Sequence, residues 1–302
     1  MTFRSNEIID NEMLLIDRLG VIRDTIAKYG EENFYLSFSG GKDSTIVSYL
    51  LDMAIPGNKI PRVFINTGIE YHKIVEFVRS KIENDNRYIE IQPIYPIKET
   101  LEKYGYPFKS KEHSNYLGRW QRGSKAFSVI RYKNEVGGRF TCPDVLKYQF
   151  AEDFALKVSE KCCDKLKKEP VHKWEKENGR KITITGMRKD EGGKRSVISC
   201  ITTRGDQIVK FHPLAVISDA WENWLIERDK IQLCDLYYEP YNFQRTGCKG
   251  CPYSLQLQND LETMEKYMPA ERKQCEWIWK PVYEEYRRLG YRLKKTEQIK
   301  LL

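Results

Sequence analysis

The segment FYLSFSGGKDS, residues 34–44, decides the fold of this chain. Its first five residues predict a short buried strand, and Gly40 and Gly41 then allow a tight turn. A helix is expected from Thr45 to Ala54, where Pro56-Gly57 stops it. Main-chain amides at such a turn, together with the positive end of the following helix, attract anions. The segment therefore predicts a phosphate-binding loop, with Ser39, Gly40, Gly41, Lys42, Asp43 and Ser44 as its contact residues.

Strands and helices alternate on both sides of this loop. The alternation predicts right-handed β-α-β units, and hence an α/β fold with a parallel twisted sheet of about five strands and helices on both faces. The expected strands are 34–38, 62–65, 88–91 and 181–185, and the expected helices are 9–26, 45–54, 71–82 and 144–161. The expected domains are an N-terminal helix (1–30), a nucleotide-binding domain (31–252) with a basic helical insertion at about 98–145, and a helical C-terminal region (253–302).

The 302 residues carry a net charge of +8, and the charge is uneven. Residues 98–139 contain ten Lys or Arg and four Asp or Glu, a net charge of +6, with aromatic residues interleaved. Cations and aromatic rings suit a single-stranded nucleic acid, which needs neutralised phosphates and stacked bases. The alternatives are a solvated surface over a small core of its own and a site for small anions.

Eight cysteines need an explanation, because no apolar run suggests export or a membrane span and the expected compartment is the cytoplasm. A reducing cytosol argues against a disulfide framework. Cys162-Cys163 and Cys248-x-x-Cys251 are spaced like metal ligands, and the second pair alone could also be a redox dithiol. The other four cysteines are interpreted as buried small apolar residues.

The string SGGKDS between a strand and a helix resembles the pyrophosphate loop (PP-loop) of the ATP pyrophosphatase superfamily. It differs from the G-x-x-x-x-G-K-[ST] loop of nucleoside triphosphatases. The resemblance implies an adenine nucleotide α-hydrolase-like fold that cleaves ATP between its α and β phosphates or holds an adenylyl sulfate. Thr67 and Gly68 resemble the end of that family's D-T-G motif, although Asn66 replaces the aspartate.

Further motifs resemble phosphoadenylyl sulfate (PAPS) reductases, in that family's order over residues 34–252. They are Gly186-Met187-Arg188 with Gly193-Lys194-Arg195-Ser196, the segment Phe211–Leu214 with Trp221, and Arg245–Pro252. The resemblance implies that Gly186, Arg188, Lys194 and Arg195 bind the nucleotide and that Lys42, Asp43 and Arg188 are catalytic. Arginine and lysine suit that role because they present a planar fork and a point charge to phosphate or sulfate.

Cys162-Cys163, followed by Lys165, Lys167, Lys168 and Pro170, resembles the cysteine pattern of adenylyl sulfate reductases. There the adjacent pair joins a later C-x-x-C to hold a [4Fe–4S] cluster. The resemblance implies that Cys162, Cys163, Cys248 and Cys251 bind such a cluster. Zinc and the absence of any metal are the alternatives, and adjacent cysteines reach two irons more easily than one zinc ion.

The reductases' C-terminal E-C-G-[LI]-H string, with its catalytic cysteine, is absent from this sequence. The leading hypothesis is therefore an adenylating sulfurtransferase that uses ATP and Mg²⁺. The sequence also resembles the ATP pyrophosphatase component of DNA phosphorothioation systems, so nucleic acid is one candidate acceptor of the sulfur. The alternatives are an adenylyl or phosphoadenylyl sulfate reductase with an external thiol, and a non-catalytic nucleotide-binding subunit.

The hypothesis implies a set of partners. The sulfur donor is expected to be another protein, a cysteine desulfurase or a thioredoxin-like protein. A homo-oligomer is one candidate assembly, and no membrane partner is expected.

Overall fold

A computed structural model describes residues 5–134 and 141–295, which form two compact units. Unit 1 combines residues up to Asn66 with His72–Ile91 and Val171–Thr246. Unit 2 combines Thr67–Tyr71 and Gln92–Pro170 with the chain from Gly247 onward. Part of the predicted basic insertion, residues 135–140, lies outside the described residues. Within the described parts of the chain, no helix is both long enough and apolar enough to cross a bilayer.

Unit 1 contains a six-stranded sheet in the order β3-β2-β1-β4-β6-β5. Neighbouring strands from β3 through to β6 run parallel, and β5 is antiparallel to β6 at one edge. The predicted α/β fold is confirmed, with six strands where about five were expected. Residues 201–211 form a two-stranded hairpin that was not among the four strands located from the sequence. The strands are β1 (Phe34–Ser37), β2 (Arg62–Ile65), β3 (Tyr88–Ile91), β4 (Ile182–Ile184), β5 (Ile201–Arg204) and β6 (Gln207–Phe211).

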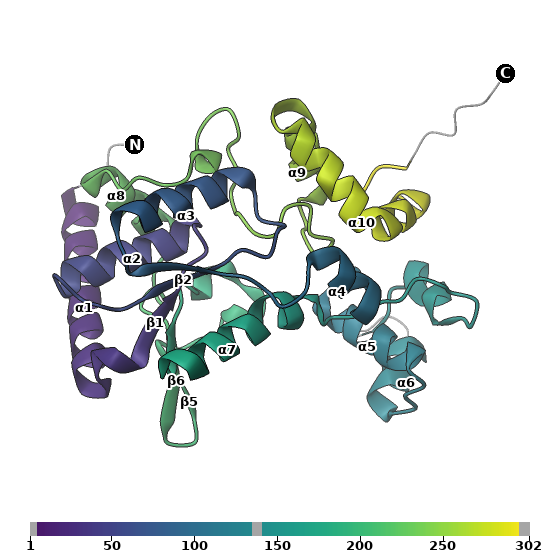
Figure 1. Ribbon diagram of the computed structural model, residues 1–302, viewed down its shortest axis with the longest axis horizontal. Coiled ribbons are helices and arrows are strands. Elements are labelled where there is room, and N and C mark those ends of the chain that lie inside the picture. The colour runs from purple at the N-terminus through teal and green to yellow at the C-terminus, as the bar shows by residue number, and fades with distance from the viewer. Residues whose placement is uncertain (1–4, 135–140, 296–302) are drawn as a thin grey trace. The chain divides into compact units, whose positions relative to one another are not determined.

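Helices cover both faces of this sheet (Figure 1). On one face Tyr35 and Val63 pack against Trp174, and the rings of Tyr35 and Trp174 lie 5.2 Å apart. Side chains alternate along a strand, so the neighbouring residues Phe34 and Leu36, also fully buried, point to the other face. The helices of unit 1 are α1 (Ser5–Tyr29), α2 (Lys42–Ala54), α3 (His72–Asn84), α7 (Glu169–Asn178) and α8 (Asp219–Asp229).

Unit 2 is helical around a polar network inside its own core. His113 is fully buried, and its two ring nitrogens bond Tyr132 Oη (2.9 Å) and Gln149 Oε1 (2.7 Å). Burial lowers the pKa of His113 to about 4, so this histidine is a neutral structural residue. The helices of unit 2 are α4 (Ile97–Tyr104), α5 (Lys111–Gln121), α6 (Phe127–Asn134), α9 (Leu257–Tyr267) and α10 (Pro269–Leu289).

The helix expected at 144–161 is wrong. A 3₁₀ helix covers Asp144–Phe150, and the following residues are mainly irregular. The reason is competition for backbone hydrogen bonds, because Tyr106 pairs with this segment as a strand would. Tyr106 N–H donates to Lys157 O (2.8 Å), Ser159 N–H donates to Tyr106 O (2.9 Å), and the Gln121 side chain accepts from Val158 N–H (2.9 Å).

Candidate functional site

The predicted phosphate loop joins the end of β1 to the start of α2, at the carboxyl edge of the sheet. In open α/β sheets this edge is where ligands bind. Gly40 has a φ of 70°, and a Cβ there would come within 3.0 Å of Ile74 and Val78 on α3. Only glycine therefore lets the chain turn this closely over α3.

Hydroxyl groups surround the second glycine of the loop. A Cβ on Gly41 would lie 3.1 Å from Ser39 Oγ and 3.2 Å from both Thr246 Oγ1 and Tyr237 Oη. Tyr237 Oη accepts a hydrogen bond from Lys42 N–H (2.9 Å) and bonds Thr246 Oγ1 (2.7 Å). Ser44 Oγ, at the start of α2, bonds both Ser39 N–H (3.2 Å) and Gly41 O (3.0 Å). The loop is thus held in a defined shape, and a hydroxyl oxygen already accepts from one of its amides.

A third glycine brings the end of β4 against the same loop. A Cβ on Gly186 would lie 2.8 Å from Asp43 Cβ and 2.9 Å from its carbonyl carbon. This close approach explains why the sequence has glycine two residues before Arg188. It also brings the chain leading to Arg188 beside Asp43.

Two cations and three carboxylates gather beside the loop. Lys42 Nζ lies 3.1 Å from both Asp219 Oδ1 and Glu222 Oε2. Arg188 Nη2 bonds the same Asp219 oxygen at 2.7 Å, while its Nε lies 3.4 Å from Glu222 Oε1 and 3.7 Å from Asp43 Oδ1. Three of the predicted residues, Lys42, Asp43 and Arg188, therefore meet in one cluster. Asp219 and Glu222 on α8 were not singled out from the sequence, although both lie close to the quoted Trp221.

The centre of this cluster is buried and incompletely satisfied. Arg188 is 3% exposed and Glu222 is fully buried. Arg188 Nε and both carboxylate oxygens of Glu222 have no aligned hydrogen-bond partner, even though they lie within ion-pair distance of opposite charges. Unsatisfied buried polar atoms are uncommon and often mark a site that a ligand completes. An arginine and a lysine held beside a glycine loop suit the phosphates of a nucleotide.

Burial raises the pKa of Glu222 to about 8, and the nearby Asp43 adds to the effect. Burial also raises the pKa of Asp43, against the pull of Arg188. With three carboxylates around two cations, one proton is held in the cluster when no ligand is bound. The side chains of Asp43 and Asp219 are 31% and 64% exposed, so Mg²⁺ could reach either carboxylate, whereas Glu222 is enclosed by the cations that it orients.

Because burial raises the pKa of Glu222, we expect the stability of the folded protein to depend on pH. The unfolded chain releases the Glu222 proton near pH 4.5 and the folded protein releases it near pH 8, so stability falls as the pH rises between these values. The free energy of unfolding should fall by at most about 1.4 kcal/mol per pH unit, the value for one proton bound in the folded but not in the unfolded state. Glu222→Gln should flatten the dependence in urea unfolding, whereas Glu227→Gln, exposed on the same helix, should leave it unchanged. Equal slopes in all three proteins would refute the raised pKa.

The remaining predicted nucleotide residues are more scattered. Arg195 is exposed and pairs with Glu191, which Arg245 also contacts at 3.0 Å. The side chain of Lys194 lies outside what the structure describes. Thr67 and Gly68 belong to unit 2, where Thr67 N–H and Oγ1 both donate to Glu70. The nucleotide-binding role of these four residues therefore stays a prediction.

The four predicted cluster cysteines all lie in unit 2, in two backbone turns. Cys162-Cys163 begins a helix that passes through a π-helical turn, Asp164–Lys168, before α7. Cys251 N–H bonds Cys248 O (3.2 Å), which closes the second turn. Gly250 has a φ of 61°, and a Cβ there would lie 2.4 Å from Tyr283 Oη, so this turn is pressed against α10.

The neighbouring cysteines affect one another's thiol pKa values at three of the four positions. Burial, and then the neighbouring cysteines, raise the pKa of Cys162, and burial followed by Cys248 raises that of Cys251 to about 12. Burial also raises the pKa of Cys248, against the attraction of Lys167. Lys167 lies between this thiol and Glu70, with its Nζ 3.5 Å from Glu70 Oε1. Such a lysine would offset the negative charge of a thiolate-bound cluster.

Within residues 5–134 and 141–295, no three His, Cys, Asp or Glu side chains are arranged to hold a metal ion. This geometry gives no support to a mononuclear zinc site. In a [4Fe–4S] cluster each cysteine binds a different iron, so the thiols need not converge on one point. The residue types, their gathering in unit 2 and the nearby cation fit that cluster chemically.

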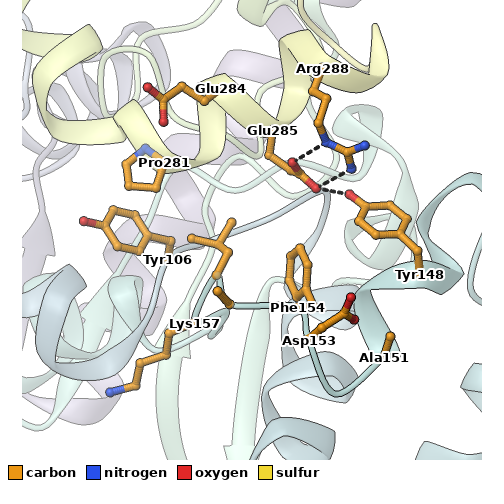
Figure 2. Close-up of a pocket in the computed structure, with 12 residues that line it drawn as sticks. Tyr106, Tyr148, Ala151, Asp153, Phe154, Lys157, Pro281, Glu284, Glu285 and Arg288 are labelled. Atoms are coloured by element: carbon orange, nitrogen blue, oxygen red, sulfur yellow. Dashed lines mark hydrogen bonds and ion pairs between the residues drawn. The ribbon is translucent and has the colours of Figure 1, made fainter.

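A separate cavity of ≈ 850 Å³, whose lining includes none of the cysteines, lies in unit 2 (Figure 2). On its wall Tyr148 Oη donates to Glu285, and Arg288 donates two 2.8 Å hydrogen bonds to the same carboxylate. Asp153 and Glu284 add further acidic groups. Three acidic side chains and the pairing of Arg288 with Glu285 make this cavity unsuited to nucleotide phosphates.

Comparison with known families adds an independent observation. Residues 142–254 match the family model of the phosphoadenosine phosphosulfate reductase domain. This segment, less than half of the chain, is therefore similar to a PAPS reductase domain. The matched segment contains Gly186, Arg188 and all four predicted cluster cysteines, and the phosphate loop precedes it. The match confirms the resemblance that the sequence motifs indicated. No curated protein matches the sequence significantly.

Solved structures resemble the chain at low identity. PAPS reductase from Candida auris, in a phosphate complex, is 14% identical with a TM-score of 0.42, covering 78% of this chain and 92% of that one. The U34-tRNA thiolase from Methanococcus maripaludis, with its [4Fe–4S] cluster, is 15% identical with a TM-score of 0.40, covering 91% and 80%. The ammonia-dependent NAD synthetase of Campylobacter jejuni is 13% identical with a TM-score of 0.40, covering 93% and 96%. Scores this low carry no argument about the reaction.

Proposed function

We propose that this protein is an ATP-dependent adenylating sulfurtransferase. One observation carries the proposal: Lys42 and Arg188 converge on a two-glycine loop around the buried, incompletely satisfied Glu222. In this reading an oxygen of the acceptor attacks the α-phosphorus of ATP. The bond from that phosphorus to the oxygen bridging to the β-phosphate breaks, and pyrophosphate leaves. A sulfur nucleophile then displaces AMP from the acceptor.

The residues of the cluster would contribute position and charge. Phosphoryl transfer depends on holding the reactants in line and neutralising the developing charge. The Lys42 ammonium would face the departing pyrophosphate, and the Arg188 fork would face the α-phosphate. Nucleotide phosphates would replace Asp219 as the partner of both cations, since Asp219 is 64% exposed and free to move aside. Mg²⁺, held by Asp43 and the phosphates, would supply further positive charge.

The four cysteines of unit 2 would hold a [4Fe–4S] cluster. When bound, such a cluster, with each iron held by a cysteine, would supply charge that polarises a nearby sulfur. This chain's own contribution is the pair of turns that present the thiols, the tight packing of Gly250 and the charge of Lys167. The two predicted sites are also close in sequence, because Thr246, beside the loop, comes two residues before Cys248.

The family match favours one second candidate, a reductase of adenylyl or phosphoadenylyl sulfate that uses an external thiol. Cys275, the cysteine nearest the C-terminus, is fully buried, and burial raises its pKa to about 12. A thiol in that state is a poor nucleophile. Reduction by this protein would therefore need a thiol from a partner.

An assay on anaerobically purified protein separates the candidates. With a candidate acceptor present, such as a single-stranded oligonucleotide, exchange of labelled pyrophosphate into ATP, or release of pyrophosphate when a sulfur donor is added, is the result expected of the sulfurtransferase. Sulfite formed from adenylyl sulfate with a thiol donor would instead establish the reductase. Tight nucleotide binding with neither reaction would leave only a nucleotide-binding subunit and reject both enzymes.

A further inference from the structure

A second cavity in unit 2, of ≈ 610 Å³, has five cations and three aromatic rings among the fifteen residues that line it. We call it the basic cavity, and define it by Lys103, Tyr104, Trp120, Arg122, Lys125 and Lys161. Lys157 adds a fifth cation to its wall and Glu152 the one carboxylate. Its size is within the range of about 300–1,000 Å³ common for ligand pockets.

The cations of the basic cavity lack acidic partners, although they lie close together. Nearby lysines are paired along their helices, as Lys98 is with Glu102 and Lys165 with Glu169. Among the described residues, no carboxylate lies within ion-pair distance of Lys103, Arg122, Lys125 or Lys161. Like charges gathered without counter-charges repel one another, so an anion that enters the cavity relieves that repulsion.

The aromatic rings sit among these cations in a fixed position. Trp120 Nε1 donates to Phe150 O (2.9 Å), which holds the indole at the end of α5. Lys125 Nζ lies 4.7 Å from the centre of the Trp120 ring, and Lys133 Nζ lies 4.0 Å from it. Tyr104 is similarly flanked by Lys103 and Lys165. A fixed ring surrounded by mobile cations can stack a base while the cations bind the flanking phosphates.

The adjoining cavity of Figure 2 provides an internal comparison. Phe154 and Lys157 line both cavities, but the facing wall of that one carries Glu284, Glu285 and Arg288, and Asp153 lies beside Phe154, so its acidic groups outnumber its cations. An anionic ligand is repelled there and attracted on the basic side. This contrast between the two cavities places the anion-binding site on the side of the segment 151–157 that lines the basic cavity.

We propose that the basic cavity binds single-stranded nucleic acid, with an unpaired base against Trp120 and the adjacent phosphates on Arg122, Lys125 and Lys161. Several separated cations suit a polymer with regularly spaced phosphates better than one small anion, and an unpaired base is available only in a single strand. The role of this strand as the sulfur acceptor rests on the function proposed above. The binding itself does not.

The test measures fluorescence anisotropy of a labelled thymidine oligomer of about twelve nucleotides, without ATP. Arg122→Gln/Lys125→Gln removes two exposed cations, and we expect affinity to fall about tenfold or more at low salt. The slope of log K against log salt should become shallower by about 1.4, or about 0.7 per lost contact. Lys173→Gln/Lys176→Gln, exposed on α7, removes the same charge elsewhere and should bind as the wild type does. Equal losses in both double variants would overturn the site.

The stacking half of the proposal has its own readout. An abasic oligomer of equal length should bind at least about tenfold more weakly than the thymidine oligomer. Trp120→Phe should keep the preference for bases and Trp120→Leu should lose it, with urea midpoints confirming that both variants fold. If abasic and thymidine oligomers bind equally, the aromatic platform is wrong. Because no nucleotide is added, these results stand apart from the outcome of the pyrophosphate exchange assay.

Discussion

Lys42→Ala is expected to lower ATP–pyrophosphate exchange by about 10²–10³-fold, the usual cost of removing one well-placed group that stabilises a transition state. Lys42 is the one cation of the loop, and its ammonium lies within 3.1 Å of the carboxylates that hold it in place. Removing it leaves Arg188 alone opposite the nucleotide phosphates. The measurement is isotope exchange at saturating ATP, with nucleotide affinity determined by calorimetry.

Lys59→Ala is the matched control, since Lys59 is exposed in the same unit outside the charge cluster. Arg188→Lys adds a second check, because a lysine keeps the charge but loses the planar fork that binds two oxygens at once. We expect Arg188→Lys to be impaired as well, and the control to behave as the wild type. Full activity of Lys42→Ala in folded protein would contradict the proposed mechanism.

Cys248→Ser is expected to abolish the iron and acid-labile sulfide of anaerobically purified protein, and with them sulfur transfer. Serine keeps the size of the side chain but is a poor ligand for iron. Pyrophosphate exchange, which depends on the loop in unit 1, should persist. This separation of the two half-reactions is the most informative result, because a variant that merely misfolds would lose both.

Cys200→Ser provides the matched control for that experiment. Cys200 lies in unit 1 and its Sγ accepts from Arg18 at 3.4 Å, so the substitution alters a thiol that has no place in the proposed cluster. It should retain the iron content and ultraviolet–visible spectrum of the wild type. Iron-free wild-type protein from strictly anaerobic preparation, with sulfur transfer intact, would remove the cluster from the proposal.

Sequence reading predicted the elements whose signals are local. The strand at residues 34–37 and the helix that follows it were predicted because an apolar run, paired glycines and a Pro-Gly stop lie within about twenty residues. The hairpin β5–β6 was missed, since its strands are short and one is largely exposed. The expected helix at 144–161 was wrong, because Tyr106, about fifty residues earlier, takes up the backbone groups of Lys157 and Ser159.

The sequence by itself determined the phosphate loop, the parallel sheet that presents it and the two cysteine pairs, because glycine spacing and residue type act over a few positions. Only the tertiary structure revealed the buried Glu222 between Lys42 and Arg188, and the unpaired cations around Trp120. Charge pairing depends on which side chains meet across separate elements and on how far water is excluded from them. Neither the pairing of charges nor the exclusion of water follows from the order of the residues. Both depend on the packing of α8 beside the loop and of residues 151–161 beside α5.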